Sequence, residues 1–120
     1  MTITLHGIKN CDSVKKARQW LSAAGIDYEF RDFRAAAPTA AEIQSWLEHC
    51  EWQQVLNKRS TTWKSLGEGD KAGVNDAATA LKLLAANPTL IKRPVLTTTD
   101  GVWIGFNSAH YERLFKPSID

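Results

Sequence analysis

The sequence has 120 residues, a length for which one domain is expected. Hydrophobic residues make up 43% of it and charged residues 23%, a globular composition that argues against intrinsic disorder. The formal net charge of +2 at pH 7 is too small to indicate binding to nucleic acid or to an anionic membrane. No stretch approaches the ~18 consecutive apolar residues of a membrane span, and the first residues do not resemble a signal peptide. Two cysteines cannot form a disulfide framework, so we expect a cytoplasmic protein.

The first third of the chain predicts a strand, a helix and a second strand. Residues 3–6 and 28–33 alternate apolar and polar side chains, as strands do. Between them, apolar residues recur at helical spacing from Val14 to Ala24, and Gly25 follows where a left-handed residue is favoured. A strand–helix–strand run of this length makes the two strands parallel, with a right-handed crossover.

The middle of the chain is expected to be helical. Thr39 and Glu42 form a capping box ahead of an apolar pattern with helical spacing. Short helical pieces and a turn-rich stretch are expected after this helix. Asn75 is expected to cap a further helix, which Asn87 and Pro88 end.

The last third predicts a hairpin and a final helix. Residues 95–98 and 102–105 are expected to be strands, because they flank an Asp-Gly turn signal at Asp100 and Gly101. Ser108 is expected to cap the terminal helix.

The predicted fold class is therefore α/β, with a mixed four-stranded sheet that is covered by helices. The order is β-α-β, a helical insert at about 39–87, then β-β-α. One domain is expected to cover residues 1–120.

Cys11 lies between the first predicted strand and the first predicted helix. Unpaired N–H groups and the positive end of the helix dipole favour a thiolate at such a position, and the thiolate is the nucleophilic form of cysteine. Lys9, Lys15 and Lys16 carry positive charge nearby in the sequence. A cysteine here can equally be a small buried hydrophobe, and its position alone leaves both interpretations open.

Three further residues have a functional and a structural interpretation. Arg93, before Pro94 at the entry of a predicted strand, is either an anion-binding guanidinium or an ordinary surface arginine. Arg59, in an irregular segment, has the same two interpretations. Cys50 ends a predicted helix beside His49 with no motif around it, and we interpret it as a structural cysteine.

Four segments together resemble the arsenate reductase (ArsC) family in its glutathione- or glutaredoxin-linked form, which is thioredoxin-like. The resemblance is greatest to the small YffB-like branch, which is related to the Spx regulators, and it extends over essentially the whole chain. The segments are ITLHGIKNCDSVKKA at 3–17, NKRSTTW at 57–63, LIKRPVL at 90–96 and VWIGF at 102–106.

The resemblance implies roles for particular residues. Cys11 matches the nucleophilic cysteine of the family, and Arg59 and Arg93 match its first two oxyanion-binding arginines. Arg93 then precedes a cis-proline at Pro94. In arsenate reductases the thiolate attacks arsenate, glutathione attacks the adduct, and glutaredoxin reduces the resulting mixed disulfide. The implied oxyanion- and substrate-binding set is Arg59, Arg93, Pro94, Asn10 and Lys9, with no metal site.

Two positions depart from the family pattern. Phe106 stands where the family has a third arginine, and a lost charge-assisted hydrogen bond worth roughly 1.5–3 kcal/mol weakens oxyanion binding about ten- to a hundredfold. Arsenate is therefore not the favoured substrate. Val14 follows Cys11 by three positions, so the Cys-x-x-Cys switch that many Spx regulators carry is absent. Cys11 would need an outside thiol such as glutathione.

Two functions are therefore considered. The first is a glutathione-dependent thiol reductase with no bound cofactor, glutathione as co-substrate and glutaredoxin as a candidate reductant. We expect such a protein to be a monomer. The alternative is an Spx-like regulator that docks on RNA polymerase without chemistry of its own.

Nucleic-acid binding and metal binding are not expected. The five tryptophans are scattered among predicted helices, which fits packing better than base stacking. The three histidines show no metal-ligand spacing with either cysteine; they are His6, His49 and His110.

Overall fold

The computed structural model describes residues 3–115. Four strands form one sheet in the order β2-β1-β3-β4. β1 pairs with β2 in parallel, whereas β3 pairs antiparallel with both β1 and β4. This is the predicted mixed α/β sheet, with the strand directions expected from the resemblance to a thioredoxin-like family. The strands are β1 (Thr4–Gly7), β2 (Glu29–Asp32), β3 (Val95–Thr98) and β4 (Gly101–Ile104).

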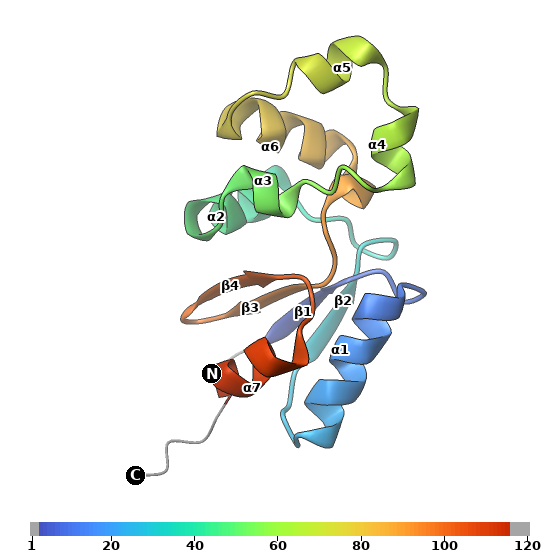
Figure 1. Cartoon of the computed structure of the whole chain (residues 1–120). Helices are drawn as coiled ribbons and strands as arrows, with labels where there is room; N and C mark the ends of the chain where they lie inside the picture. Colours follow the sequence, from blue (N-terminus) through green and yellow to red (C-terminus); the bar gives the residue numbers. More distant parts are fainter. Residues whose placement is uncertain (1–2, 116–120) are drawn as a thin grey trace.

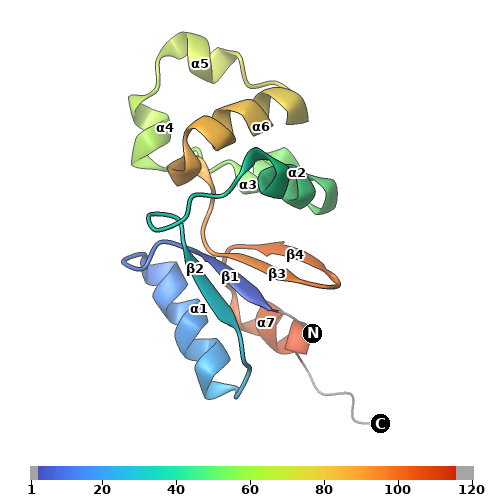
Figure 2. The same ribbon diagram turned by 180° about the vertical axis from the view of Figure 1, so that it is seen from behind.

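Helices cover both faces of the sheet (Figures 1 and 2). α1 (Asp12–Ala23) and α7 (Ser108–Phe115) lie on one face. The other face carries the segment between β2 and β3, which we call the insert. Its helices are α2 (Ala40–His49), α3 (Trp52–Val55), α4 (Thr61–Ser65), α5 (Glu68–Ala72), α6 (Ala77–Ala86) and the 3-10 helix η1 (Pro88–Leu90). No helix within residues 3–115 is long and apolar enough to cross a membrane.

The alternation of side chains along the strands divides the core into two clusters. Leu5 and Leu96 are paired across β1 and β3 and pack with Leu21 and Tyr111 of α1 and α7. Val95 points to the other face and packs with residues of the insert. The sheet is thus an apolar layer between two groups of helices, and its ends remain available for a site.

Several helix boundaries confirm the sequence prediction. Thr39 and Glu42 form the capping box of α2, and Gly25 adopts a φ of 71° just after α1. Two predicted caps are wrong by one residue. Asp76, not Asn75, accepts the hydrogen bond from the Thr79 N–H at the start of α6.

α7 shows the second such difference. The side chain of Asn107, not that of Ser108, accepts from the backbone N–H of His110 at 3.1 Å. The neighbouring residues are all of types that cap helices, so composition alone does not decide between them. α5 and η1 were not predicted, because a single turn of helix leaves almost no periodic pattern.

Gly7 fixes how closely α1 approaches β1. A Cβ atom built on Gly7 would lie 2.6 Å from Cγ2 of Val14, which is fully buried in the first turns of α1. Only glycine therefore allows this approach, and the approach determines where the N-terminus of α1 lies.

The Gly7→Ala substitution is expected to lower the free energy of unfolding by about 1–3 kcal/mol, because the added methyl group overpacks this contact. Combined with Val14→Ala, it should cost less than the sum of the two single substitutions, because the second removes the clashing atoms. Urea denaturation measures both. Gly69→Ala is the matched control, since its Cβ would meet nothing within 4 Å. A Gly7→Ala protein as stable as the control would contradict the close approach.

Candidate functional site

Cys11 is held at the N-terminus of α1 by a tight turn that follows β1. Its backbone N–H donates to the carbonyl oxygen of Ile8 at 3.0 Å, and its own carbonyl accepts from the N–H of Lys15 at 2.9 Å. Cys11 is therefore the N-cap residue, with an extended backbone and no capping hydrogen bond from its side chain. Cys11 is partly buried and packs against the core on the insert side, and its thiol forms no hydrogen bond with residues 3–115.

The first turn of α1 offers open hydrogen-bond donors beside Cys11. In the described part of the chain, no protein acceptor pairs with the backbone N–H groups of Asp12, Ser13 and Val14. These groups and the helix dipole favour negative charge at this end. The carboxylate of Asp12 opposes an additional anion there, a feature that the sequence analysis did not consider.

Pro94 lies across the sheet from the residue that leads into this turn. β1 and β3 are antiparallel, and their last pair is His6 opposite Val95, so Gly7 and Pro94 come next at this end of the ladder. Neighbouring strands are about 4.8 Å apart, so the turn before Cys11 and the entry of β3 share one end of the sheet. The Arg93–Pro94 peptide bond is cis, as the resemblance implies.

Arg93 is partly buried at this end of the sheet. Its Nη1 donates to the carbonyl oxygen of Thr89 at 3.3 Å. Its Nε atom is buried and has no hydrogen-bond partner among the described residues. A buried guanidinium N–H without an acceptor is costly, and an anionic ligand would satisfy it.

Arg59 is tied to the same region by a short β-bridge. Leu56 pairs with Ile91, and the N–H of Lys92 donates to the carbonyl of Val55 at 2.8 Å. The loop between α3 and α4, which carries Arg59, is thereby fixed beside the segment that leads to Arg93. The side chain of Arg59 is exposed.

The structure brings some of the predicted residues together and separates others. Cys11, Pro94 and Arg93 lie at one end of the sheet, and Lys9 and Asn10 are the exposed corners of the turn before Cys11. Neither arginine forms a hydrogen bond with the Cys11 thiol within residues 3–115. Their roles remain predictions.

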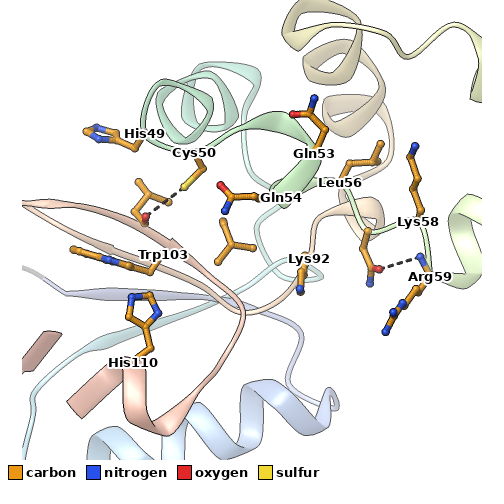
Figure 3. Close-up of a pocket in the computed structure, with 13 residues that line it drawn as sticks. His49, Cys50, Gln53, Gln54, Leu56, Lys58, Arg59, Lys92, Trp103 and His110 are labelled. Atoms are coloured by element: carbon orange, nitrogen blue, oxygen red, sulfur yellow. Dashed lines mark hydrogen bonds between the residues drawn. The ribbon is translucent and has the colours of Figure 1, made fainter. Parts of the chain in front are cut away.

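Arg59 instead lines a cavity of about 870 Å³ between the insert, β4 and α7 (Figure 3). We call this cavity the basic cleft, because none of its lining residues is acidic. Cys11 and Arg93 do not line it. Its basic side chains are those of Lys58, Arg59, Lys92, His49 and His110. Sequence analysis did not find this cleft, because its walls come from segments far apart in the chain.

Cys50 also lines the basic cleft, in a setting unlike that of Cys11. Its thiol donates to the carbonyl oxygen of Val102 at 3.3 Å, and burial raises its pKa. At a given pH less of Cys50 is therefore thiolate, which lowers its reactivity. Cys50 packs against the same core cluster as Cys11, so the structural role predicted for Cys50 stays a prediction.

Phe106, which stands at the third arginine position of the family, is part of the core on the α7 side. Its ring meets that of Tyr111 edge to face, with 4.9 Å between the centroids. The aromatic contact stabilises the start of α7. It supplies no positive charge to an anion.

His6 is a buried polar residue that the sequence analysis did not identify as important. It is 4% exposed and contacts the ring of Trp46 in α2 with 5.1 Å between the centroids. Its Nε2 lies 3.1 Å from the hydroxyl of Thr97. Burial, with a smaller contribution from the Arg31 guanidinium, lowers the pKa of His6 to about 4, whereas Glu42, paired with Arg31, raises it slightly.

The folded protein is expected to lose stability as the pH falls from 6.5 to about 4. In this range unfolded His6 binds a proton and folded His6 does not, so the free energy of unfolding decreases, by on the order of 2–3 kcal/mol from this residue. Urea denaturation at several pH values measures the slope, and His6→Phe should flatten it. An imidazole NMR titration of His6 with a midpoint near 6.5 would contradict the burial effect.

Comparisons with known proteins place the chain among its relatives. Residues 6–114 match the model of the ArsC family. An uncharacterized protein of Haemophilus influenzae is 42% identical over 113 residues, which are 94% of this chain and 98% of the relative. The global transcriptional regulator Spx 2 of Lactococcus lactis is 28% identical over 117 residues, 96% of this chain and 86% of the relative.

Two solved structures are also similar. A YffB protein is 39% identical with a TM-score of 0.89, and the match covers 93% of this chain and 97% of that one. An arsenate reductase (ArsC) related protein from Brucella melitensis is 43% identical with a TM-score of 0.74, over 98% of this chain and 97% of that one.

Proposed function

Because the chain belongs to the ArsC family, we propose that it is a thiol-dependent oxidoreductase with Cys11 as its nucleophile. One observation carries the proposal. The thiol of Cys11 is partly exposed, makes no capping hydrogen bond, and stands beside three backbone N–H groups that have no protein acceptor. These donors stabilise a thiolate and the negative charge that develops during its reactions. The names of relatives such as the Brucella melitensis protein support the same class of chemistry.

Glutathione is the proposed co-substrate. Its two carboxylates need cationic partners, and Arg93 and Arg59 flank the segment that enters β3. The unpaired Nε of Arg93 is a donor that a carboxylate would satisfy. Lys9, Asn10 and Pro94, at the same end of the sheet as Cys11, complete the proposed binding set.

The proposed reaction is the reduction of a mixed disulfide by thiol–disulfide exchange. The Cys11 thiolate attacks the glutathione sulfur of the substrate, and the substrate leaves as its thiolate, which takes up a proton. A second glutathione thiolate then attacks the Cys11–glutathione disulfide. This releases glutathione disulfide and restores the Cys11 thiolate. The disulfide bond has thereby passed from the substrate to two glutathione sulfurs, one that came with the substrate and one from the single free glutathione that is consumed.

Arsenate is a less suitable substrate, because Phe106 removes one of three expected charges. An external thiol or glutaredoxin is the proposed reductant, since neither position that could hold an internal resolving thiol is suitable. The second position of a Cys-x-x-Cys pair holds Val14, which is fully buried against Gly7. Cys50, the other cysteine, lies in the basic cleft, which Cys11 does not line. We expect a monomer that acts in the cytoplasm, where glutathione is reduced.

Incubation with oxidised glutathione is expected to place one glutathione on Cys11 and none on Cys50 at neutral pH. Cys50 reacts slowly because its burial raises its pKa and holds it as the neutral thiol. Mass spectrometry of the intact protein and of its peptides measures this. Cys11→Ser should abolish the adduct and Cys50→Ser should leave it unchanged. An adduct on Cys50 alone, or on neither residue, would exclude the proposal.

Arg59→Ala and Arg93→Ala are each expected to slow glutathionylation of Cys11 about five- to a hundredfold, because each removes a charge-assisted hydrogen bond to glutathione. The rate with the neutral disulfide of 2-mercaptoethanol should change much less, since that reagent has no carboxylate. Lys64→Ala, which removes an exposed charge from α4, is the matched control. Equal slowing with both disulfides would mean that the arginines do not hold glutathione.

The alternative function is regulation through RNA polymerase. It is supported by the similarity to a protein named as a global transcriptional regulator, over 96% of this chain. Under this alternative the purified protein should retain RNA polymerase subunits from a cell extract, and Cys11→Ser should retain them equally. Retention that is lost in Cys11→Ser would favour thiol chemistry over docking without chemistry.

A further inference from the structure

β4 is an edge strand whose free side opens into the basic cleft. Within residues 3–115 its only strand partner is β3, and residues 102–104 line the cleft. The backbone N–H of Gly105 donates to the carbonyl of Pro94 at 2.8 Å. Hydrogen-bonded and non-hydrogen-bonded pairs alternate along an antiparallel ladder, so this bond determines which residues of β4 hydrogen-bond to β3. Trp103 therefore faces β3 with its backbone groups, and Val102 and Ile104 direct theirs away from the sheet.

Most of these outward backbone groups have no partner in the described part of the chain. The exception is the carbonyl of Val102, which accepts from the Cys50 thiol at 3.3 Å. A thiol is a weak donor, so a backbone N–H of an added strand could replace the Cys50 thiol at this carbonyl. The N–H of Val102 and both backbone groups of Ile104 form no hydrogen bond with residues 3–115. This is the arrangement that accepts an additional strand.

The cleft provides room and side-chain contacts on both faces of an added strand. Alternate side chains of a strand point in opposite directions. Those on one face would meet the insert, where Gln53 and Gln54 line the cleft (Figure 3). Those on the other would meet Trp103 and His110.

The charge of the cleft indicates what kind of peptide it fits. Lys58, Arg59 and Lys92 line it, and no aspartate or glutamate among the described residues does so. Such a surface attracts acidic segments and repels basic ones. The cavity of about 870 Å³ also exceeds what a single small anion would fill.

We propose that the basic cleft is a docking site for an extended acidic segment of a partner protein, which adds as a fifth strand to the free edge of β4. The segment would pair with Val102 and Ile104 through its backbone and with the cationic side chains through its carboxylates. Its N–H replaces the Cys50 thiol at the carbonyl of Val102. Docking requires no chemistry at Cys11, although Arg59 belongs both to the cleft and to the proposed glutathione-binding set.

The probe is the peptide acetyl-Glu-Glu-Val-Thr-Val-Glu-Glu-amide, whose acidic ends allow either strand direction. Binding is expected to protect the amide hydrogens of Val102 and Ile104 from exchange, whereas that of Trp103 is protected already. Isotope-labelled protein followed by NMR measures this residue by residue. The Cys11→Ser protein should bind equally well.

Matched peptides and variants separate backbone pairing from charge. A peptide that is N-methylated at every second amide keeps the N–H groups along one of its two edges and should bind. A peptide that is methylated at every amide has no N–H group to pair with β4 and should not bind. A peptide with Lys in place of Glu should bind at least about tenfold more weakly. Lys58→Glu together with Lys92→Glu should reverse that preference. Neither lysine belongs to the proposed thiol site.

Three results would overturn the proposal. The first is no saturable binding at about millimolar peptide. The second is binding that leaves the exchange of Val102 and Ile104 unchanged, since the cleft would then recognise charge alone. The third is protection of these amides in the absence of peptide that increases with protein concentration, together with a dimer in sedimentation. A second copy of the chain would then occupy the edge of β4.

Discussion

The pairing of β1 with β3 is the constraint on which the candidate site depends. The ladder ends at His6 and Val95, so the chain leaves β1 toward Cys11 at the same end of the sheet where it enters β3 after Arg93 and Pro94. Because Gly7 has no Cβ, the side chain of Val14 can pack directly against it, and this contact determines where the first turn of α1 lies. A cysteine at a helix terminus and the backbone of an arginine from a distant part of the sequence thus lie at one end of the sheet.

The two cysteines illustrate how position in the fold determines chemistry. Cys11 is an N-cap residue with open backbone donors beside it, whereas Cys50 is half-buried and donates to a backbone carbonyl. The first setting leaves backbone donors open to an anion, whereas burial in the second raises the pKa of the Cys50 thiol. The insert similarly has two functions in space. It covers one face of the sheet, and the end of α2, α3 and the loop after α3 form a wall of the basic cleft.

Much of the fold could be predicted because local signals were strong. The capping box of Thr39 and Glu42 and the glycine after α1 each fix a backbone conformation within a few residues. The hairpin was predicted in the right place but one residue late, because Gly101 is not part of the turn and instead opens β4, paired with Thr98. Adjacent residues of similar capping strength, such as Asn75 and Asp76, could not be distinguished. The burial of His6 and the free edge of β4 depend on sheet register and on helices far along the chain. No local pattern reports these.

The most direct test is the rate at which the Cys11 thiol of a Cys50→Ser protein reacts with a small neutral disulfide, measured folded and in concentrated urea at the same pH near 7. The neutral reagent removes any contribution from the arginines as glutathione ligands. If backbone donors at the start of α1 stabilise the thiolate, the folded protein should react at least about tenfold faster. An equal or slower rate in the folded protein would show that the fold does not activate Cys11.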